Sequence, residues 1–430
     1  MGDREMNDLI IEEPPELGSS ISEEVQNRYT NWKKNTRLLY DYLNTNTSKW
    51  PSLTCQFFPD LAVSNDQQRI LLSSFTSQQL PSDESLYISS ISTMNHIKWS
   101  SINNFDMDEM EFKMDNSVKL KVREKNLQEE VRITYPDGDC NRCRYMPQNP
   151  DIIGTVSSNG SVYVFDRTKH GNKISTGRKF EIECRSGNEQ GQDESVSLAW
   201  NHNLVGILAS CQTNGKVNVW DIKKFDKNTR RIENTTRQSI TDSNGVNDVS
   251  WMVNHTSILA SCGESNTISI MDTRKSPNEN DVIHRTSHLD GINSIEFNPK
   301  NDMLLCTGDS QGQLKVWDIR NFTEPVRSWR HSENQDSISS IQWNPHMPQI
   351  VASADQNTGL VKIWNTSESG ENMLLFVHGG HMLGVNDISW SLHTKWTICS
   401  VSNDNSIHIW KPANNLVESE LGSNCNNTIL

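Results

Sequence analysis

The sequence lacks any long apolar run. No stretch approaches the ~18 consecutive apolar residues of a membrane-spanning helix, and Met373 to Val377 is typical of the longest. No basic segment followed by an apolar core opens the chain, so we expect no signal peptide. A net charge of −14 excludes a strongly basic nucleic-acid-binding protein. With 34% hydrophobic and 22% charged residues over 430 positions, the composition is that of a polar globular chain.

Signatures of common active sites are also absent. The sequence contains no G-x-x-x-x-G-K-[ST], G-x-G-x-x-G, H-E-x-x-H or G-x-S-x-G run. His284 and His288 have i, i+4 spacing but fall in an expected loop. We therefore predict a protein that is not an enzyme and that has no cofactor and no metal.

The nine cysteines are odd in number and irregularly spaced, which favours reduced, buried thiols in a nuclear or cytosolic protein. Cys140 and Cys143 form a single C-x-x-C without a second pair or a histidine at zinc spacing. In a regular strand these two thiols would not converge, so we expect no metal there.

Acidic residues are concentrated at the start of the chain. Residues 1–24 hold eight acidic side chains against Arg4 alone, which is about half of the net charge. Few large apolar residues accompany them, so we predict a disordered acidic tail over residues 1–19.

A helix is predicted directly after this tail. Ser20 and Glu23 have the spacing of a capping box. Apolar residues then recur at steps of three and four, which indicates an amphipathic helix from about residue 22 to 43. Trp50-Pro51 would end it, and we expect the strand at 53–58 to be the outer strand of the last repeat, joining the two ends of the chain.

From residue 139 the sequence repeats. An aromatic residue closes one strand of each unit at intervals of 46 to 55 residues: Tyr145, Trp200, Trp251, Phe297, Trp343 and Trp390. A second strand ends in Trp-Asp or a variant of it, as in Trp220-Asp221, and Asn-Gly pairs provide hairpin turns. This period with four strands is the WD-repeat pattern. Six units are clear, and a weaker one lies near residues 69–91.

We therefore predict an all-β fold: a seven-bladed WD-repeat β-propeller with an N-terminal helix packed on its side. The expected parts are the acidic tail (1–19), the helix (20–45), the propeller (46–412) and a flexible C-terminal tail (413–430). We interpret Trp200, Trp251, Trp343 and Trp390 as blade core. Asp248 and Asp387, each three residues before a Trp, are expected to hold turns.

Several longer strings resemble one family. Trp32-Lys33-Lys34-Asn35-Thr36, Trp50-Pro51-Ser52-Leu53-Thr54 and His378-Gly379-Gly380-His381 are similar to the signatures of the retinoblastoma-binding-type histone-binding WD-repeat proteins, and so is the string over 144–150. Within that family, residues 103–110 resemble the small subunits of fungal chromatin assembly factor one. The resemblance covers about residues 22 to 412.

The resemblance implies a non-catalytic scaffold that takes the first helix of histone H4 between the N-terminal helix and an acidic loop of blade six. A basic amphipathic helix requires an apolar groove with carboxylates at its rim. The residues that match this groove are Leu38, Leu39, Asp41, Tyr42, Glu368, Glu371, Leu374, Leu375, Phe376 and Ile407. The loop lacks the paired prolines of the family, which favours a looser groove.

A second site is implied at the top of the propeller, where acids of the family receive the unmodified histone H3 tail. Asp139, Asn141 and Glu194 match those positions. Asn247, Gly291 and Ser337 stand where the family often has acids.

The resulting hypothesis is a histone H3–H4-binding subunit of the chromatin assembly factor complex in replication-coupled nucleosome assembly. We expect a protein of the nucleus, with the cytoplasm as a second location, that binds larger subunits of that complex, without direct sequence-specific nucleic-acid binding or membrane association. Three alternatives remain open: a histone-binding subunit of type B histone acetyltransferase or of another chromatin complex, a ubiquitin-ligase substrate receptor that uses the W-D-x-R string at 317–320, and an enzyme with an active site at the channel mouth. Leu38 and Tyr42 could also simply attach the helix to the propeller.

Overall fold

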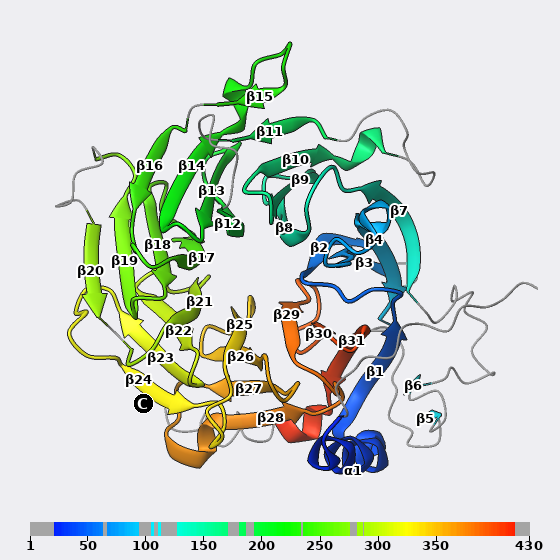
Figure 1. Cartoon of the computed structure of the whole chain (residues 1–430). Coiled ribbons are helices and arrows are strands. Elements are labelled where there is room, and N and C mark those ends of the chain that lie inside the picture. Colours follow the sequence, from blue (N-terminus) through cyan, green and yellow to red (C-terminus); the bar gives the residue numbers. More distant parts are fainter. Residues whose placement is uncertain are drawn as a thin grey trace, which may run out of the picture.

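The computed structural model arranges seven β-sheets radially around a central axis, with one helix on the outside (Figure 1). The predicted seven-bladed propeller is therefore confirmed. Within the described residues, no helix has the length and apolar character that crossing a membrane requires. The structure describes residues 21–62, 67–93, 105–106, 111–112, 127–170, 180–185, 193–233, 235–275, 282–286 and 288–417. The predicted acidic tail and residues 418–430 of the expected flexible tail lie outside these ranges.

Each blade is an antiparallel meander whose first strand lies closest to the axis, except that blade seven takes its outer strand from the start of the chain. Blades one to three consist of β2 (Cys55–Ala62), β3 (Gln67–Ser73), β4 (Ser85–Ser92) and β7 (Gln128–Thr134); β8 (Cys140–Met146), β9 (Asn149–Ser157), β10 (Val162–Asp166) and β11 (Ile182–Cys184); and β12 (Ser195–Trp200), β13 (Ile207–Gln212), β14 (Lys216–Asp221) and β16 (Arg237–Ile240). A fifth strand, β15 (Arg231–Ile232), pairs parallel to β11.

Blades four to seven repeat the pattern with less variation in length. They consist of β17 (Val246–Trp251), β18 (Ile258–Gly263), β19 (Thr267–Asp272) and β20 (Val282–Thr286); β21 (Ile292–Phe297), β22 (Leu304–Asp309), β23 (Gln313–Asp318) and β24 (Arg327–Arg330); β25 (Ile338–Trp343), β26 (Ile350–Asp355), β27 (Val361–Asn365) and β28 (Leu374–His378); and β29 (Val385–Trp390), β30 (Ile398–Ser402), β31 (Ser406–Pro412) and β1 (Tyr40–Thr47). A small separate hairpin joins β5 (Phe105–Asp106) to β6 (Glu111–Phe112).

The helix α1 (Glu23–Leu39) is shorter than the predicted helix over residues 22–43. Its N-cap is Ser22, whose hydroxyl accepts a hydrogen bond from the Val25 amide at 3.3 Å. The helix ends at Leu39 because the next eight residues, rich in Asn and Thr, form β1 and pair with β31. This register places Leu43 opposite Trp410 and buries both side chains completely.

The two ends of the chain are therefore joined by β1, and the expectation that residues 53–58 provide this outer strand is wrong. Those residues run into β2, which is the innermost strand of blade one. The C-terminal tail also begins later than predicted. Ala413 and Val417 are buried, and the Ala413 amide donates to the Leu39 carbonyl at 2.9 Å.

The repeated tryptophans are buried, which confirms that they belong to the blade core. Each also connects two blades, because its indole N–H donates to a backbone carbonyl of the preceding innermost strand. The Trp200 indole donates to the Arg144 carbonyl at 2.8 Å, and that of Trp390 donates to the Gln342 carbonyl at 3.0 Å. Sequence periodicity identifies these residues, whereas their role between blades is visible only in the fold.

The aspartates three residues before a Trp do not hold turns, contrary to the expectation. Asp248 and Asp387 lie on innermost strands and accept hydrogen bonds across blade boundaries. Asp248 pairs with Arg142 at 3.0 Å and Asp387 pairs with Arg144 at 2.9 Å. The four charged groups line a cavity of about 440 Å³ on the propeller axis. The β-turns are instead held by aspartates at the ends of second strands, such as Asp309.

The C-x-x-C pair also departs from the expectation. Cys140 and Cys143 are both fully buried in one hydrophobic cluster, because a β-bulge between Cys140 and Arg142 shifts the alternation of side chains. Burial and the neighbouring Cys143 thiol raise the pKa of Cys140. All eight cysteines within the described residues are buried and free, as the sequence predicts for reduced thiols.

Candidate functional site

Helix α1 packs along the edge where blades six and seven meet (Figure 1). Near its start, the Arg28 guanidinium donates to the Thr358 carbonyl at 2.5 Å and to the His381 carbonyl at 2.6 Å. Burial lowers the pKa of Arg28, and nearby carboxylates, first Asp355, oppose that shift. A positive group therefore fixes the helix to two loops on one face of the propeller.

In the middle of α1, Trp32 is the main anchor. Its side chain is 6% exposed and stacks on His408, with the ring planes 5° apart. A Cβ atom at Gly380 would lie 2.6 Å from the Trp32 ring, so only glycine allows the indole to approach this closely. The His-Gly-Gly-His string thus has a packing role that sequence spacing alone does not reveal.

At the end of α1, the structure brings together part of the predicted groove. Leu39 is partly buried against a cluster that contains Leu375 and Phe376. The rings of Phe376 and Tyr40 meet edge to face at a centroid distance of 5.3 Å. Leu38, beside them in sequence, points to solvent and is 61% exposed. An exposed leucine next to a formed apolar cluster offers a first contact to a docking helix.

Three predicted groove residues lie elsewhere. Tyr42 and Ile407 are buried in the cluster that joins blade seven to blade one, and the Tyr42 hydroxyl donates to the Ser92 carbonyl at 3.1 Å. Leu374 packs on the opposite side of blade six, against the cluster shared with blade five. The cause is strand alternation, which directs neighbouring residues of a strand to opposite faces of the sheet. Tyr42 is therefore structural, whereas Leu38 does not attach the helix.

The two acidic residues whose side chains are described lie near the surface. The Asp41 carboxylate accepts a hydrogen bond from the Asn414 amide at 3.1 Å and lies 3.8 Å from the Lys411 ammonium. Glu368 is half-buried just before the short 3-10 helix η6 (Gly370–Met373). The side chain of Glu371 lies outside the described part of the chain.

The three residues of the second predicted site share one face of blades two and three. The Asn141 amide donates to the Ser195 carbonyl at 2.9 Å, while Asp139 accepts from the Gln78 amide at 3.2 Å and Glu194 is exposed. Sequence reasoning missed Glu84, a buried acid beside Asp139. Burial, and secondarily Asp139, raises the pKa of Glu84 to about 7, while hydrogen bonds from Thr76 oppose the shift. Its position depends on tertiary contacts that no motif marks.

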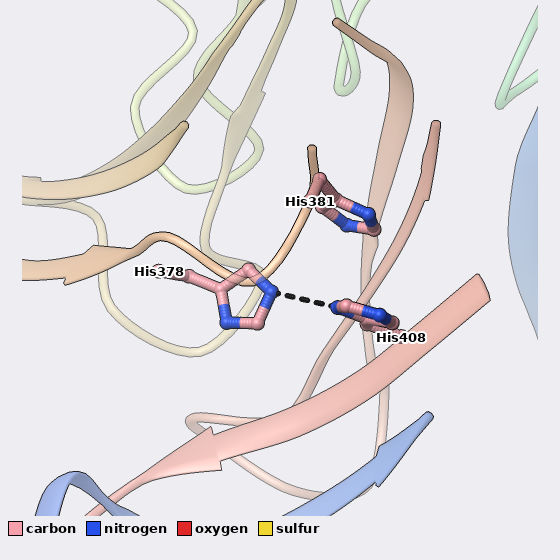
Figure 2. Close-up of side chains that lie close together, drawn as sticks. All are labelled: His378, His381 and His408. Carbon is pink, nitrogen blue, oxygen red and sulfur yellow. Dashed lines mark hydrogen bonds between the residues drawn. The ribbon is translucent and has the colours of Figure 1, made fainter. Parts of the chain in front are cut away.

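Three histidines approach one another beneath α1: His378, His381 and His408 (Figure 2). Their ligand atoms all lie within 4.8 Å, so the group must be tested as a metal centre. The rings of His381 and His408 are stacked, 15° from parallel with centroids 4.1 Å apart. Lone pairs of imidazole nitrogens lie in the ring plane, so two stacked rings cannot direct theirs at one ion.

Both nitrogens of His381 are also engaged, with Ser406 at 2.6 Å and Ser400 at 2.7 Å. Ser400 in turn accepts from the Trp410 indole, and His288 makes the matching contacts in blade five with Asp309, Thr307 and Trp317. His381 is thus the blade-seven copy of a structural hydrogen-bond network. The three residues do not fit a metal centre.

The W-D-x-R string has a local structural role. Arg320 forms an ion pair with Asp318 at 2.6 Å, and Arg274 repeats this with Asp272 at 2.6 Å on the neighbouring blade. Hydrogen bonds from each arginine lower the pKa of its aspartate. Both guanidinium groups are mostly exposed.

Comparison with known proteins supports the same region. A family model that describes the histone-binding protein RBBP4 and its counterpart in the CAF1 complex matches residues 27–95, which include most of α1 and all of β1. A second model, for the N-terminal β-propeller domain of proteins like nucleolar protein 10, matches residues 231–408. The chain is 50% identical over 415 residues to the histone-binding protein MSI1 of Saccharomyces cerevisiae, covering 93% of this chain and 96% of the relative.

The fold and these matches define the class: the chain belongs to the family of histone-binding WD-repeat proteins of the RBBP4 type.

Proposed function

We propose that this protein is a non-catalytic scaffold that binds histones H3 and H4 and serves as a subunit of a chromatin assembly factor complex in the nucleus. The main support is that the matched segment over residues 27–95 is the one that folds as α1 and docks beside blade six. The yeast relative is itself named a histone-binding protein.

The proposed H4 contact lies at the end of α1. Leu38 and Leu39 supply an apolar edge above the buried Leu375–Phe376 cluster. Asp41 and Glu368 place carboxylates near that edge, where a basic helix would bring lysines and arginines. The apolar contacts provide affinity and the carboxylates select the charge of the partner. The acidic face formed by Asp139 and Glu194 is proposed to receive the H3 tail.

Leu38→Ala tests the groove. Because Leu38 is exposed in the free protein, the substitution removes a docking contact without opening a core cavity. We expect affinity for a peptide of the first H4 helix to fall by about 1–3 kcal/mol, roughly 5- to 150-fold, in isothermal titration calorimetry.

Leu289→Ala is the matched control. Leu289 is 96% exposed between β20 and β21, in neither of the two blades that contact α1, and its removal should leave affinity unchanged. Equal affinities of the Leu38→Ala variant and the unsubstituted protein would refute the H4 site. Adding Leu39→Ala and Leu375→Ala should weaken binding further in variants that circular dichroism shows to be folded.

A further inference from the structure

The three histidines beneath α1 are linked to the helix by a chain of hydrogen bonds. The Trp32 indole lies 2.8 Å from the Tyr40 hydroxyl, which lies 2.7 Å from Nδ1 of His378. Nε2 of His378 then lies 3.1 Å from Nδ1 of His408 (Figure 2). The chain therefore runs from α1 through β1 to β28 and β31.

Only one arrangement of protons satisfies every contact. An indole can only donate, so the Tyr40 hydroxyl accepts from Trp32 and must donate to Nδ1 of His378. A neutral His378 then carries its proton on Nε2 and donates to Nδ1 of His408. Both histidines are thus neutral, and their tautomers are determined by a residue of α1.

An added proton breaks this chain at either histidine. A protonated His408 would face the Nε2 proton of His378 with a proton of its own at 3.1 Å. A protonated His378 would donate to Tyr40, whose own hydroxyl proton would then have no acceptor in the chain. The charge would also be buried, since His378 is 0% and His408 is 4% exposed.

The surrounding charges give little compensation. On α1, Arg28 faces His378 and His381 with a positive charge. Asp404, in the turn before β31, faces His381 and His408 and favours their protonation, but burial outweighs it. Burial is the largest cause that lowers the pKa of all three histidines, and it lowers that of His381 to about 4.

Helix α1 can respond locally, because little of it is buried. Of its 17 residues only Trp32 and Thr36 are buried, and Trp32 covers both His378 and His408. Undocking the helix would therefore uncover these two histidines and return them to their ordinary pKa of ~6.5.

We propose that α1 is held by a proton-sensitive latch: the helix stays docked while His378 and His408 are neutral and is released when they take up protons. His381 is not part of the latch, because its blade-seven network does not depend on α1. The latch goes beyond the proposed histone binding and is tested in the free chain, so either can fail without the other.

The sign follows from linkage. The docked state takes up fewer protons than the undocked state, so docking weakens as pH falls below ~6.5. Between pH 7.5 and 5.5, each uncovered histidine multiplies the undocking equilibrium by about 10, and two histidines multiply it by about 100.

Hydrogen exchange of the full chain, read by mass spectrometry, measures this equilibrium. Rates at pH 7.5 and 5.5 are divided by the intrinsic exchange rate at each pH. We expect the protection of α1 amides to fall about 100-fold, while that of peptides from blades three and four stays constant.

His408→Asn tests the mechanism, because the Asn oxygen can accept from His378 without titrating. Its pH effect on α1 should fall to about 10-fold. His331→Asn is the control: this buried histidine holds the corresponding network of blade six and should leave the 100-fold effect intact. Equal pH effects in His408→Asn and the unsubstituted chain would overturn the latch. If His408→Asn does not fold, an effect of less than 10-fold in the unsubstituted chain overturns it as well.

Discussion

Blades four to six and the closing region around α1, β1 and blade seven use the same contacts in different ways. In blade five, His288 connects Asp309 to Thr307 and stops there. In blade seven, the corresponding His381 lies against two further histidines, and α1 covers them. A repeated structural contact thus became the attachment point of the one element outside the repeat. Histone binding is proposed at the other end of the same helix.

The largest expected effect concerns the buried ion pairs on the propeller axis. Asp387 joins blade seven to blade one, because it accepts from the Cys55 amide and from Arg144. Asp387→Ala would leave Arg144 buried without its partner, so we expect a loss of about 3–5 kcal/mol in urea unfolding. Asp248→Ala removes the equivalent pair with Arg142 in the repeat region. If only the Asp387 variant exposes the β2 amides to hydrogen exchange, the closing region is the weaker boundary; equal exposure in both would remove the distinction.

A smaller effect is expected where α1 touches blade seven. Gly380→Ala would place a methyl group 2.6 Å from the Trp32 ring, whereas the nearest atom to a Cβ at Gly379 is 3.6 Å away. Gly380→Ala should therefore weaken helix docking by about 1–3 kcal/mol, measured as lost protection of α1 amides, and Gly379→Ala should have little effect. Identical protection in the two variants would contradict the close packing of Trp32.

The smallest effect compares two repeat blades. Glu296 and Gln342 occupy matching positions, and each accepts from the amide of a Trp in the next blade. Burial raises the pKa of Glu296 to about 8. The folded state therefore holds a proton that the unfolded state loses above its ordinary pKa of ~4.3, so stability falls as pH rises from there towards 8.

Glu296→Gln should abolish this pH dependence. At pH 7 the variant should be more stable by about 1–2 kcal/mol in urea unfolding, with no gain at pH 4. Gln342→Glu is the reciprocal test and should introduce the same dependence in blade six. A pH-independent difference between Glu296→Gln and the unsubstituted protein would show that the carboxyl does not titrate in this range.

Sequence reasoning succeeded where structure repeats. The spacing of Trp200, Trp251, Trp343 and Trp390 indicated seven blades and their core because each residue has the same environment in every unit. It was least accurate where the chain leaves the repeat. The stripe that seemed to continue to Leu43 is divided between a helix and a strand, since pairing with β31 outweighs helical periodicity.

The same limit applies to the predicted groove. The resemblance placed Leu39, Leu375 and Phe376 together, but strand alternation directs Tyr42, Leu374 and Ile407 into other clusters. Glu84 beside Asp139 and the contact of Trp32 with His408 join residues far apart in sequence, and no local pattern marks them.

The sequence by itself determined the class of fold, the number of blades and the family, because these depend on periods and strings that local composition encodes. Only the tertiary structure decided how the ring closes, which face of each strand meets α1 and which histidines are neutral. Those outcomes depend on packing between distant segments, where burial and the direction of each hydrogen bond are set by neighbours that the chain brings together on folding.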